Sequence, residues 1–143
     1  MNLSELSRIK LPRAIALAAE AHDGQVDKAG APYILHPLRV MLQMETDEER
    51  IVAVLHDILE DTHVDGHTIS NLFGSEIFTA VYALTRQKDE TYHAFIERAK
   101  KNPLARKVKI ADIRDNLRPG APHLRARYEN ALLALYSEEE ERG

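Results

Sequence analysis

One aliphatic run that abruptly acquires charge constrains this chain more than any other feature. Residues 51–62 have the sequence IVAVLHDILEDT, which sets His56, Asp57, Glu60 and Asp61 among apolar side chains. On one helix, His56 would lie over Glu60 and Asp57 over Asp61, next to an aliphatic face. No Lys or Arg lies within one turn of these groups, so we expect a divalent metal ion to compensate their charge. The alternative is a solvated polar face with ordinary ion pairs.

Length and composition narrow the fold and the chemistry. A chain of 143 residues can form one domain, and we expect a single domain over 1–143 with its core at about 11–137. The lack of cysteine excludes disulfides, thiolate nucleophiles and iron–sulfur clusters, which leaves His, Asp and Glu as metal ligands. The net charge of −4 provides no general attraction for nucleic acid. With no apolar run of signal or membrane-spanning length, the sequence predicts a soluble, cytoplasmic protein without membrane partners, and it leaves the oligomeric state open.

Apolar residues recur with helical spacing along the chain, and no segment alternates as a strand would. Helices are expected over Leu11–Asp23, Tyr33–Met44, Thr46 to about Asp61, Ile69–Leu84 with a break at Gly74, Thr91–Lys100, Asn102 to Pro119-Gly120, and His123–Tyr136. Pro12 suits the first turn of its helix, Thr46 and Glu49 match a capping box, and Thr68 could cap the helix that follows. The sequence therefore predicts an all-α fold, a compact bundle of roughly six or seven helices, with an acidic tail at 137–143 that should fray.

A second chemical segment lies near the C-terminal end. Asp112 and Asn116 are four residues apart, on one face of the predicted helix, among apolar residues that would face the central helix. A buried aspartate needs a partner, so we interpret Asp112 as a metal ligand and Asn116 as a neutral hydrogen-bonding arm for a substrate. Arg114 and Asp115 are expected on other faces, as surface charges.

Several further residues have two interpretations. His36, at a helix entrance before Pro37, is well placed to bind a metal, although an isolated histidine is more often an ordinary core or surface residue. Lys28, in the loop GQVDKAGAP, is either solvated or neutralises phosphate oxygens. His22 more simply packs or caps its helix than binds a metal. Arg86 is expected in a solvated linker at 85–90, and Tyr128 could point either way.

Three motifs of the chain are distinctive when taken together: AHDGQVDKAGAPYILHP at 21–37, VLHDILEDT at 54–62 and KIADIRDNL at 109–117. Jointly they resemble the hydrolase domain of RelA/SpoT homologues. Within them, His36, His56-Asp57 and Asp112 match the H…HD…D pattern of HD-domain metal-dependent phosphohydrolases. The resemblance implies the HD-domain helical bundle and a metal-dependent hydrolase whose partner is a small nucleotide.

The resemblance also implies roles for individual residues. His36, His56, Asp57 and Asp112 would hold Mn²⁺, with Fe²⁺, Zn²⁺ or Mg²⁺ left open by the ligand types. Glu60 and Asp61 would act on the attacking water, and Asn116 would contact the nucleotide. The implied reaction removes the 3′-pyrophosphate of guanosine 3′,5′-bis(diphosphate), ppGpp, or a related alarmone, and yields a nucleoside diphosphate and pyrophosphate.

Two departures from the family pattern bear on the substrate. Asp27-Lys28-Ala29 stands where the family has Arg-Lys-Ser, so an acid replaces the arginine that would stack on guanine. We expect relaxed base selectivity, a phosphate contact from Lys28, and phosphate or ribose contacts from Asn116 and Tyr128. The family's Asp-Arg-x-His-Asn is Asp112-Ile113-Arg114-Asp115-Asn116 here. The alternatives are hydrolysis of another nucleotide, such as NADPH or a nucleoside monophosphate, or a non-catalytic nucleotide-sensing domain.

Overall fold

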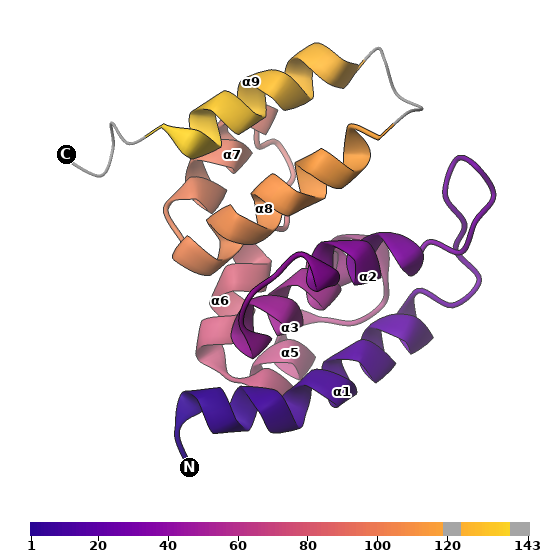
Figure 1. Cartoon of the computed structure of the whole chain (residues 1–143), viewed down its shortest axis with the longest axis vertical. Helices are drawn as coiled ribbons and strands as arrows, with labels where there is room; N and C mark the ends of the chain where they lie inside the picture. Colours follow the sequence, from indigo (N-terminus) through magenta and orange to yellow (C-terminus); the bar gives the residue numbers. More distant parts are fainter. Residues whose placement is uncertain (119–123, 138–143) are drawn as a thin grey trace.

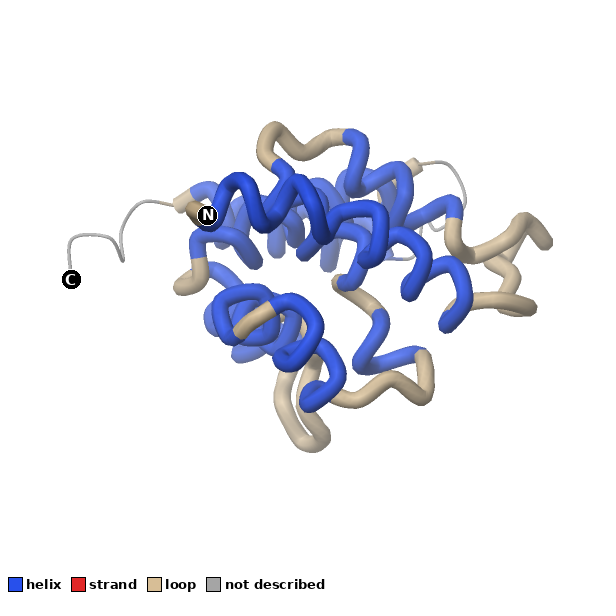
Figure 2. The backbone as a smooth tube through the Cα atoms, turned by 90° about the horizontal axis from the view of Figure 1, so that it is seen from below, coloured by secondary structure: helices blue, strands red, loops and turns tan. Residues whose placement is uncertain are grey.

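The computed structural model describes residues 1–118 and 124–137, and within these ranges the chain is helical without a β-strand (Figures 1 and 2). The predicted all-α class is therefore confirmed. The helices are α1 (Leu3–Ala21), α2 (Leu35–Leu42), α3 (Asp47–Leu55), α4 (Ile58–Asp61), α5 (Gly66–Phe73), α6 (Ser75–Ala83), α7 (Tyr92–Lys100), α8 (Pro103–Asn116) and α9 (Arg125–Tyr136). They outnumber the six or seven expected, mainly because two predicted helices are each divided in two.

The first helix begins earlier than predicted. Asn2 and Glu5 form a capping box, in which the Asn2 side chain accepts from the Glu5 backbone N–H and the Glu5 side chain accepts from that of Asn2. This reciprocal pairing satisfies two N–H groups that a helix start leaves without partners. Pro12 consequently lies inside α1. The predicted start at Leu11 was wrong because Pro12 was interpreted as a first-turn residue.

The central helix is interrupted in the middle of its chemical segment. It begins as predicted, with Thr46 and Glu49 forming the capping box of α3. However, α3 ends at Leu55 and does not continue to Asp61. The backbone N–H of His56 bonds to the carbonyl of Ala53, three residues back, and the His56 ring bonds to the same carbonyl, so the regular ladder stops there. His56 and Asp57 thus lie at a bend between α3 and the single turn of α4.

The break between α5 and α6 falls at Gly74, as predicted. Gly74 has φ +94°, a left-handed conformation that favours glycine. The start of α5 differs from the prediction, because Asp65 and not Thr68 is the N-cap. Asp65 accepts hydrogen bonds from both the backbone N–H and the hydroxyl of Thr68, so the carboxylate outcompetes the hydroxyl as the capping group.

The core consists of two clusters of buried apolar residues. The larger cluster is formed by α1 to α6 and the N-terminal part of α8, with Val40, Ile51, Leu55 and Ile69 among its fully buried members. The smaller cluster joins α7, α8 and α9 through Phe95, Ile96, Ile113, Ala131 and Leu135. In Figure 1, α7 to α9 lie at the end of the molecule opposite α1. Helix α8 packs against both clusters and therefore connects them.

Two predictions fall partly outside the described residues. Helix α9 begins at Arg125, and the predicted start at His123 and the stop at Pro119-Gly120 lie outside the described ranges. The same holds for most of the predicted acidic tail, of which only Ser137 is described, as the C-cap of α9.

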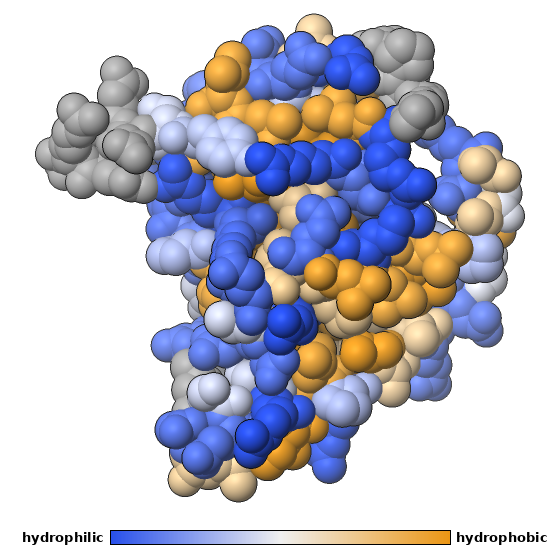
Figure 3. Space-filling model, in the orientation of Figure 1, coloured by the Kyte–Doolittle hydropathy of each residue, from blue (hydrophilic) through white to orange (hydrophobic). Residues whose placement is uncertain are grey.

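Apolar side chains also reach the surface. Leu42 at the end of α2 and Leu133 on α9 are 76% and 71% exposed, and orange patches appear over both helices in Figure 3. Among the described helices, none combines the length and hydropathy needed to cross a membrane.

Candidate active site

The predicted metal ligands converge from three parts of the fold. His36 comes from α2, His56 and Asp57 from the bend between α3 and α4, and Asp112 from α8. His36 Nε2 lies 2.9 Å from Asp112 Oδ1 and 3.8 Å from Asp57 Oδ2. His56 Nε2 lies 3.1 Å from Asp57 Oδ2 and 3.3 Å from Asp112 Oδ1. The structure thus brings together two imidazoles and two carboxylates that are distant in sequence.

The donor chemistry of this cluster suits a divalent metal ion. One ring nitrogen of His56, Nδ1, lies 2.6 Å from the Ala53 carbonyl oxygen and can only donate to it. The other, Nε2, is buried, has no hydrogen-bond partner, and faces the two carboxylates. If the imidazole is neutral, its Nε2 lone pair points at two carboxylates, and these groups repel each other. A cation bound between the ring and the carboxylates would remove this repulsion. The candidate ligand atoms of His36, His56 and Asp112 lie within 4.8 Å of one another, close enough to share one ion.

The electrostatics of the cluster follow from its burial and its opposed charges. Burial alone would lower the pKa of His56, but the carboxylates of Asp57 and Asp112 outweigh it and raise that pKa well above its ordinary value. Burial would raise the pKa of Asp112, but Lys109 and the imidazoles hold it well below its ordinary value. Protons and a metal ion would therefore compete for the same imidazole lone pairs.

Three neighbouring side chains hold the carboxylates in place. The Tyr33 hydroxyl donates to Asp57 Oδ2. Lys109 Nζ donates to Asp112 Oδ2 at 2.7 Å, and Asn116 Nδ2 lies 3.3 Å from Asp112 Oδ1. Lys109 is the partner that a buried Asp112 requires. The sequence analysis did not predict this ion pair. The signal for it was that Lys109 lies three residues before Asp112 on the same helix.

Asp115 corrects the prediction of a surface charge. It is 7% exposed, and its Oδ2 lies 2.6 Å from His36 Nδ1. Arg39 donates to both of its oxygens, from Nε at 2.8 Å and from Nη2 at 2.9 Å. The prediction was wrong because Asp115 packs against α2, a tertiary contact that spacing along α8 does not reveal. Asp115 holds the imidazole of His36 from the side opposite the cluster.

Glu60 lies at the rim of the cluster. Its Oε1 accepts a hydrogen bond of 2.6 Å from the backbone N–H of Arg86. Burial of the carboxyl group and the nearby charges of Asp57 and Asp61 raise the pKa of Glu60, although the backbone N–H opposes them. The connector after α6, predicted as a solvated linker, is thus fixed to the site through Arg86.

Asp61 lies beside Glu60 and is held through its backbone. Gln25 Nε2 donates to the Asp61 carbonyl at 2.8 Å, and Gln25 Oε1 lies 2.8 Å from His22 Nδ1. His22 is the C-cap of α1, in agreement with the preferred interpretation of this residue. Burial and the charge of Asp57 raise the pKa of the Asp61 carboxyl group. Helix α1 therefore helps to position the turn that carries both acids.

The three predicted substrate contacts occupy different environments. Asn116 touches the cluster through Asp112. Tyr128 is half-buried and packs against the smaller apolar cluster. Lys28 is exposed in the loop between α1 and α2, and within the described residues it makes no hydrogen bond or ion pair. Only Asn116 is thus brought into contact with the predicted ligands.

Asp27 has a structural role that the sequence did not indicate. Its Oδ1 accepts hydrogen bonds from the backbone N–H groups of Ala29 and Ala31, at 2.9 and 3.0 Å. These bonds close the loop between α1 and α2, as short polar side chains often do in turns. An arginine at this position could not make them.

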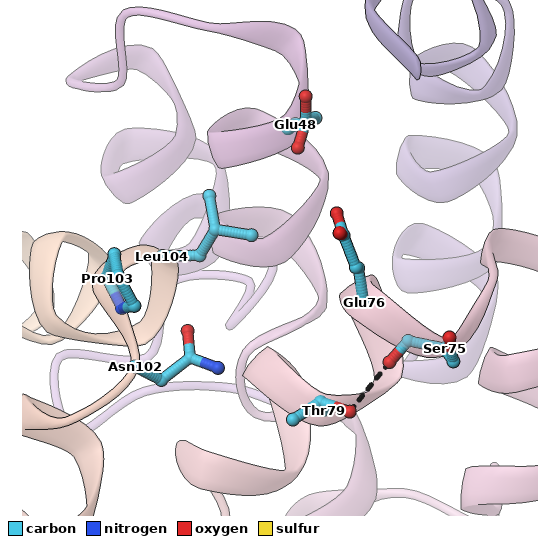
Figure 4. Close-up of a pocket in the computed structure, with 7 residues that line it drawn as sticks. All are labelled: Glu48, Ser75, Glu76, Thr79, Asn102, Pro103 and Leu104. Carbon is cyan, nitrogen blue, oxygen red and sulfur yellow. Dashed lines mark hydrogen bonds between the residues drawn. The ribbon is translucent and has the colours of Figure 1, made fainter. Parts of the chain in front are cut away.

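A hollow elsewhere on the molecule contains none of the predicted site residues. It is lined by residues at the N-terminal ends of α3, α6 and α8: Glu48, Ser75, Glu76, Thr79, Asn102, Pro103 and Leu104 (Figure 4). The Thr79 hydroxyl donates to the Ser75 carbonyl within α6. The residues that line this hollow include no histidine and no pair of carboxylates in contact. The hollow is therefore separate from the cluster of His and Asp residues.

Comparisons with known proteins connect the chain to one family. Residues 14–126 match the family described as HD domain. A guanosine-3′,5′-bis(diphosphate) 3′-pyrophosphohydrolase from Aquifex aeolicus is 33% identical over 121 residues, which cover 76% of this chain and 17% of that protein. The bifunctional (p)ppGpp synthase/hydrolase SpoT of Escherichia coli is 35% identical over 81 residues, 54% of this chain and 12% of that protein. The chain thus spans less than a fifth of the length of these curated relatives.

A solved structure has the same fold. It belongs to a study of a metazoan orthologue of SpoT that hydrolyses ppGpp, and it matches with a TM-score of 0.72 over 88% of this chain and 84% of its own. The sequences are 23% identical, so this likeness concerns the fold.

Proposed function

Because the chain belongs to the HD-domain family, we propose that it is a metal-dependent phosphohydrolase that acts on a nucleotide. The observation that carries the proposal is the convergence of His36, His56, Asp57 and Asp112, with the buried and unpartnered Nε2 of His56 among them. The names of the relatives support ppGpp or a related alarmone as the substrate, with a nucleoside diphosphate and pyrophosphate as products.

The two histidines and two aspartates would hold the ion. When bound, a divalent ion supplies Lewis-acid activation of the attacking water and of the phosphoryl group. Nitrogen and carboxylate ligands without sulfur favour Mn²⁺ or Fe²⁺ and also accept Zn²⁺ or Mg²⁺. We propose Mn²⁺ as the preferred ion, in keeping with the resemblance to RelA/SpoT hydrolase domains.

The remaining residues orient the ligands and move the proton. Asp115 and the Ala53 carbonyl fix the rings of His36 and His56, while Tyr33 and Lys109 fix Asp57 and Asp112. Glu60 and Asp61 would accept a proton from the attacking water. Their raised pKa values bring them closer to neutral pH, where a carboxylate is a more effective general base.

Three further residues would contact the nucleotide substrate. Asn116, which already touches Asp112, would bind the nucleotide beside the reacting phosphate. Lys28 would contact phosphate from its loop, and Tyr128 would contact phosphate or ribose. Since Asp27 closes the loop and offers no cation for stacking, we propose relaxed selectivity for the base. A cytoplasmic location and the lack of nucleic-acid and membrane partners stay predictions from the sequence.

A panel of substrates tests this function. The purified protein is incubated with Mn²⁺ and, separately, ppGpp, its adenosine counterpart, NADPH and nucleoside monophosphates, and the products are separated by anion-exchange chromatography. We expect pyrophosphate and a nucleoside diphosphate from both alarmones, and no product from Asp112→Ala. Turnover of NADPH or a monophosphate with neither alarmone touched would contradict the alarmone assignment. Tight binding without any product would instead indicate the nucleotide-sensing alternative.

A further inference from the structure

Two arginines from different parts of the chain converge on one tyrosine ring. Tyr92 is the first residue of α7. The guanidinium carbon of Arg127, on α9, lies 3.8 Å from the centroid of the Tyr92 ring. That of Arg86, in the connector after α6, lies 5.7 Å from the same centroid. Both arginines are exposed, so their outer donors face solvent.

Within the described residues, neither arginine side chain forms an ion pair or a hydrogen bond with a carboxylate. The nearest connector acid, Glu90, is already engaged by Arg98, which donates to both of its oxygens at 2.9 and 3.0 Å. Arg86 uses only its Nε, which donates to the Glu90 backbone carbonyl at 3.0 Å. Two like charges held at one ring repel each other, and an anion between them would offset that repulsion. This arrangement contrasts with Arg125 on α9, which has an ion pair with Glu129 at 3.2 Å.

The arginine pair adjoins the predicted metal cluster. The backbone N–H of Arg86 donates to Glu60, one of the two predicted catalytic acids. Lys109, bonded to Asp112, lies 4.9 Å from the ring centroid of Phe95, which in turn is 6.1 Å from that of Tyr92. The Tyr92 hydroxyl is buried without a hydrogen-bond partner, within electrostatic reach of both Lys109 and Asp112. Cations therefore lie at both ends of this row of contacts, with Lys109 beside the cluster and the two arginines at the Tyr92 ring.

We propose that Arg86 and Arg127 form a second anion subsite, which binds the phosphate groups of the substrate that are not cleaved. The ligand class is a nucleotide with a second, separate phosphate arm, since the reacting arm would occupy the cluster of His36, His56, Asp57 and Asp112. A guanidinium group presents parallel N–H donors that match phosphate oxygens, and its stacking on Tyr92 holds it ready for that contact. The proposal rests on the proposed function, because it assigns part of the substrate of the same site.

The test compares two substrates in matched variants. One substrate is guanosine 3′,5′-bis(diphosphate), and the other is guanosine 3′-diphosphate, which lacks the 5′ arm. We expect Arg127→Met and Arg86→Met each to raise KM for the full substrate about tenfold, the loss expected for one charge-assisted hydrogen bond, with kcat nearly unchanged. KM for the truncated substrate should not change in either variant. Arg125→Met, on the same helix, should have the KM of the parent for both substrates. The KM of Arg127→Lys for the full substrate should fall between those of the parent and Arg127→Met.

The outcomes separate this proposal from the proposed function. An equal rise in KM for both substrates, or no rise for either, overturns the second subsite and leaves the hydrolase assignment intact. If the parent hydrolyses neither nucleotide, calorimetric titration with inorganic pyrophosphate in the absence of divalent ions still tests the subsite. We then expect the parent and Arg125→Met to bind, and Arg127→Met and Arg86→Met to bind about tenfold more weakly. Equal binding by all four proteins, or none by the parent, overturns the proposal.

Discussion

Asp115 and Arg39 extend the candidate metal centre beyond its predicted ligands. A ligating histidine needs its second ring nitrogen protonated and held, so that the first one faces the ion. Asp115 does this for His36 at 2.6 Å, and the two bonds from Arg39 offset the charge of the buried carboxylate. Asp115 stands where the RelA/SpoT pattern has a histidine. This support is therefore a feature of this chain that differs from the family pattern.

Removing this support should weaken metal binding. We expect Asp115→Ala to lower the affinity for Mn²⁺ about 10- to 100-fold, and Arg39→Met to lower it less, because the ring of His36 loses its orientation. Asp115→Asn, which keeps one acceptor oxygen, should recover part of the loss. The matched control is Arg118→Met, since Arg118 lies 3.5 Å from the same carboxylate with a side chain that is 58% exposed. Isothermal titration measures each affinity, and a parent-like value for Asp115→Ala would refute the role of this residue.

Single residues were predictable from sequence where their chemistry conflicted with their surroundings. His56, Asp57 and Asp112 stood out as polar groups among apolar neighbours, and the structure brings them together. Asp115 was missed because its partners, His36 and Arg39, lie on α2. The packing of α2 against α8 is a tertiary contact that spacing along one helix does not reveal.

Among the helices, three starts were predictable from local capping, whereas the starts of α1 and α5 were predicted wrongly. Thr46, Thr91 and Asn102 each cap the helix expected after them, because capping is a local interaction. The bend at His56 was not predicted. A single interrupted turn leaves the apolar spacing on both sides almost unchanged, so periodicity gives no signal of it. This bend separates the buried ligands from the exposed acids Glu60 and Asp61.

The loop between α1 and α2 provides a prediction about Asp27. We expect Asp27→Ala to loosen the loop, because the backbone N–H groups of Ala29 and Ala31 lose their acceptor. Asp27→Asn keeps the accepting oxygen and serves as the control. Limited proteolysis should cut Asp27→Ala faster within residues 24–32 than either the parent or Asp27→Asn. Identical cleavage rates for all three proteins would show that Asp27 does not close the loop in solution.

The connector between α6 and α7 provides a pH-dependent prediction. The two hydrogen bonds from Arg98 lower the pKa of Glu90 from its ordinary value of 4.5 to about 2, against the opposing effect of burial. A carboxyl group whose pKa is lowered on folding stabilises the native state above its unfolded pKa, and this contribution is lost as the pH falls toward its folded pKa.

Glu90→Gln should therefore cost stability at neutral pH and progressively less in acid. We expect a loss of about 1–2 kcal/mol in the free energy of unfolding at pH 7, because the charge-assisted bonds become neutral ones. The difference from the parent should shrink as the pH is lowered from about 4.5 toward 2. Urea unfolding of both proteins at a series of pH values measures this difference in the free energy of unfolding. A difference that is constant across this range would contradict the assigned pKa.

At the scale of the molecule, the candidate metal centre lies where the parts of the fold meet. Its ligands come from α2, the bend after α3, and α8, and α8 belongs to both apolar clusters. The all-α class was predictable because apolar periodicity is a property of each segment. The division of the core into two apolar clusters was not predictable, since it depends on which helices pack together.

An ion shared by these elements should stabilise the whole fold. At a free Mn²⁺ concentration 100 times its dissociation constant, we expect the free energy of unfolding to rise by about 2.7 kcal/mol, because only the folded chain assembles the ligands. Thermal unfolding with and without Mn²⁺ measures this as a higher midpoint. His56→Ala should show no comparable shift. A shift of the same size in His56→Ala would place the ion elsewhere.

The metal dependence of pyrophosphate release from ppGpp tests most directly whether the cluster of His and Asp residues is the active site. The protein is stripped with a chelator, dialysed, and assayed for released pyrophosphate while Mn²⁺ is titrated back. We expect no release above background without the ion, and a rate that rises to saturation as the ion binds. Release that is equally fast in the chelated protein would contradict this expectation, because the cluster of His36, His56, Asp57 and Asp112 would then have no part in the reaction.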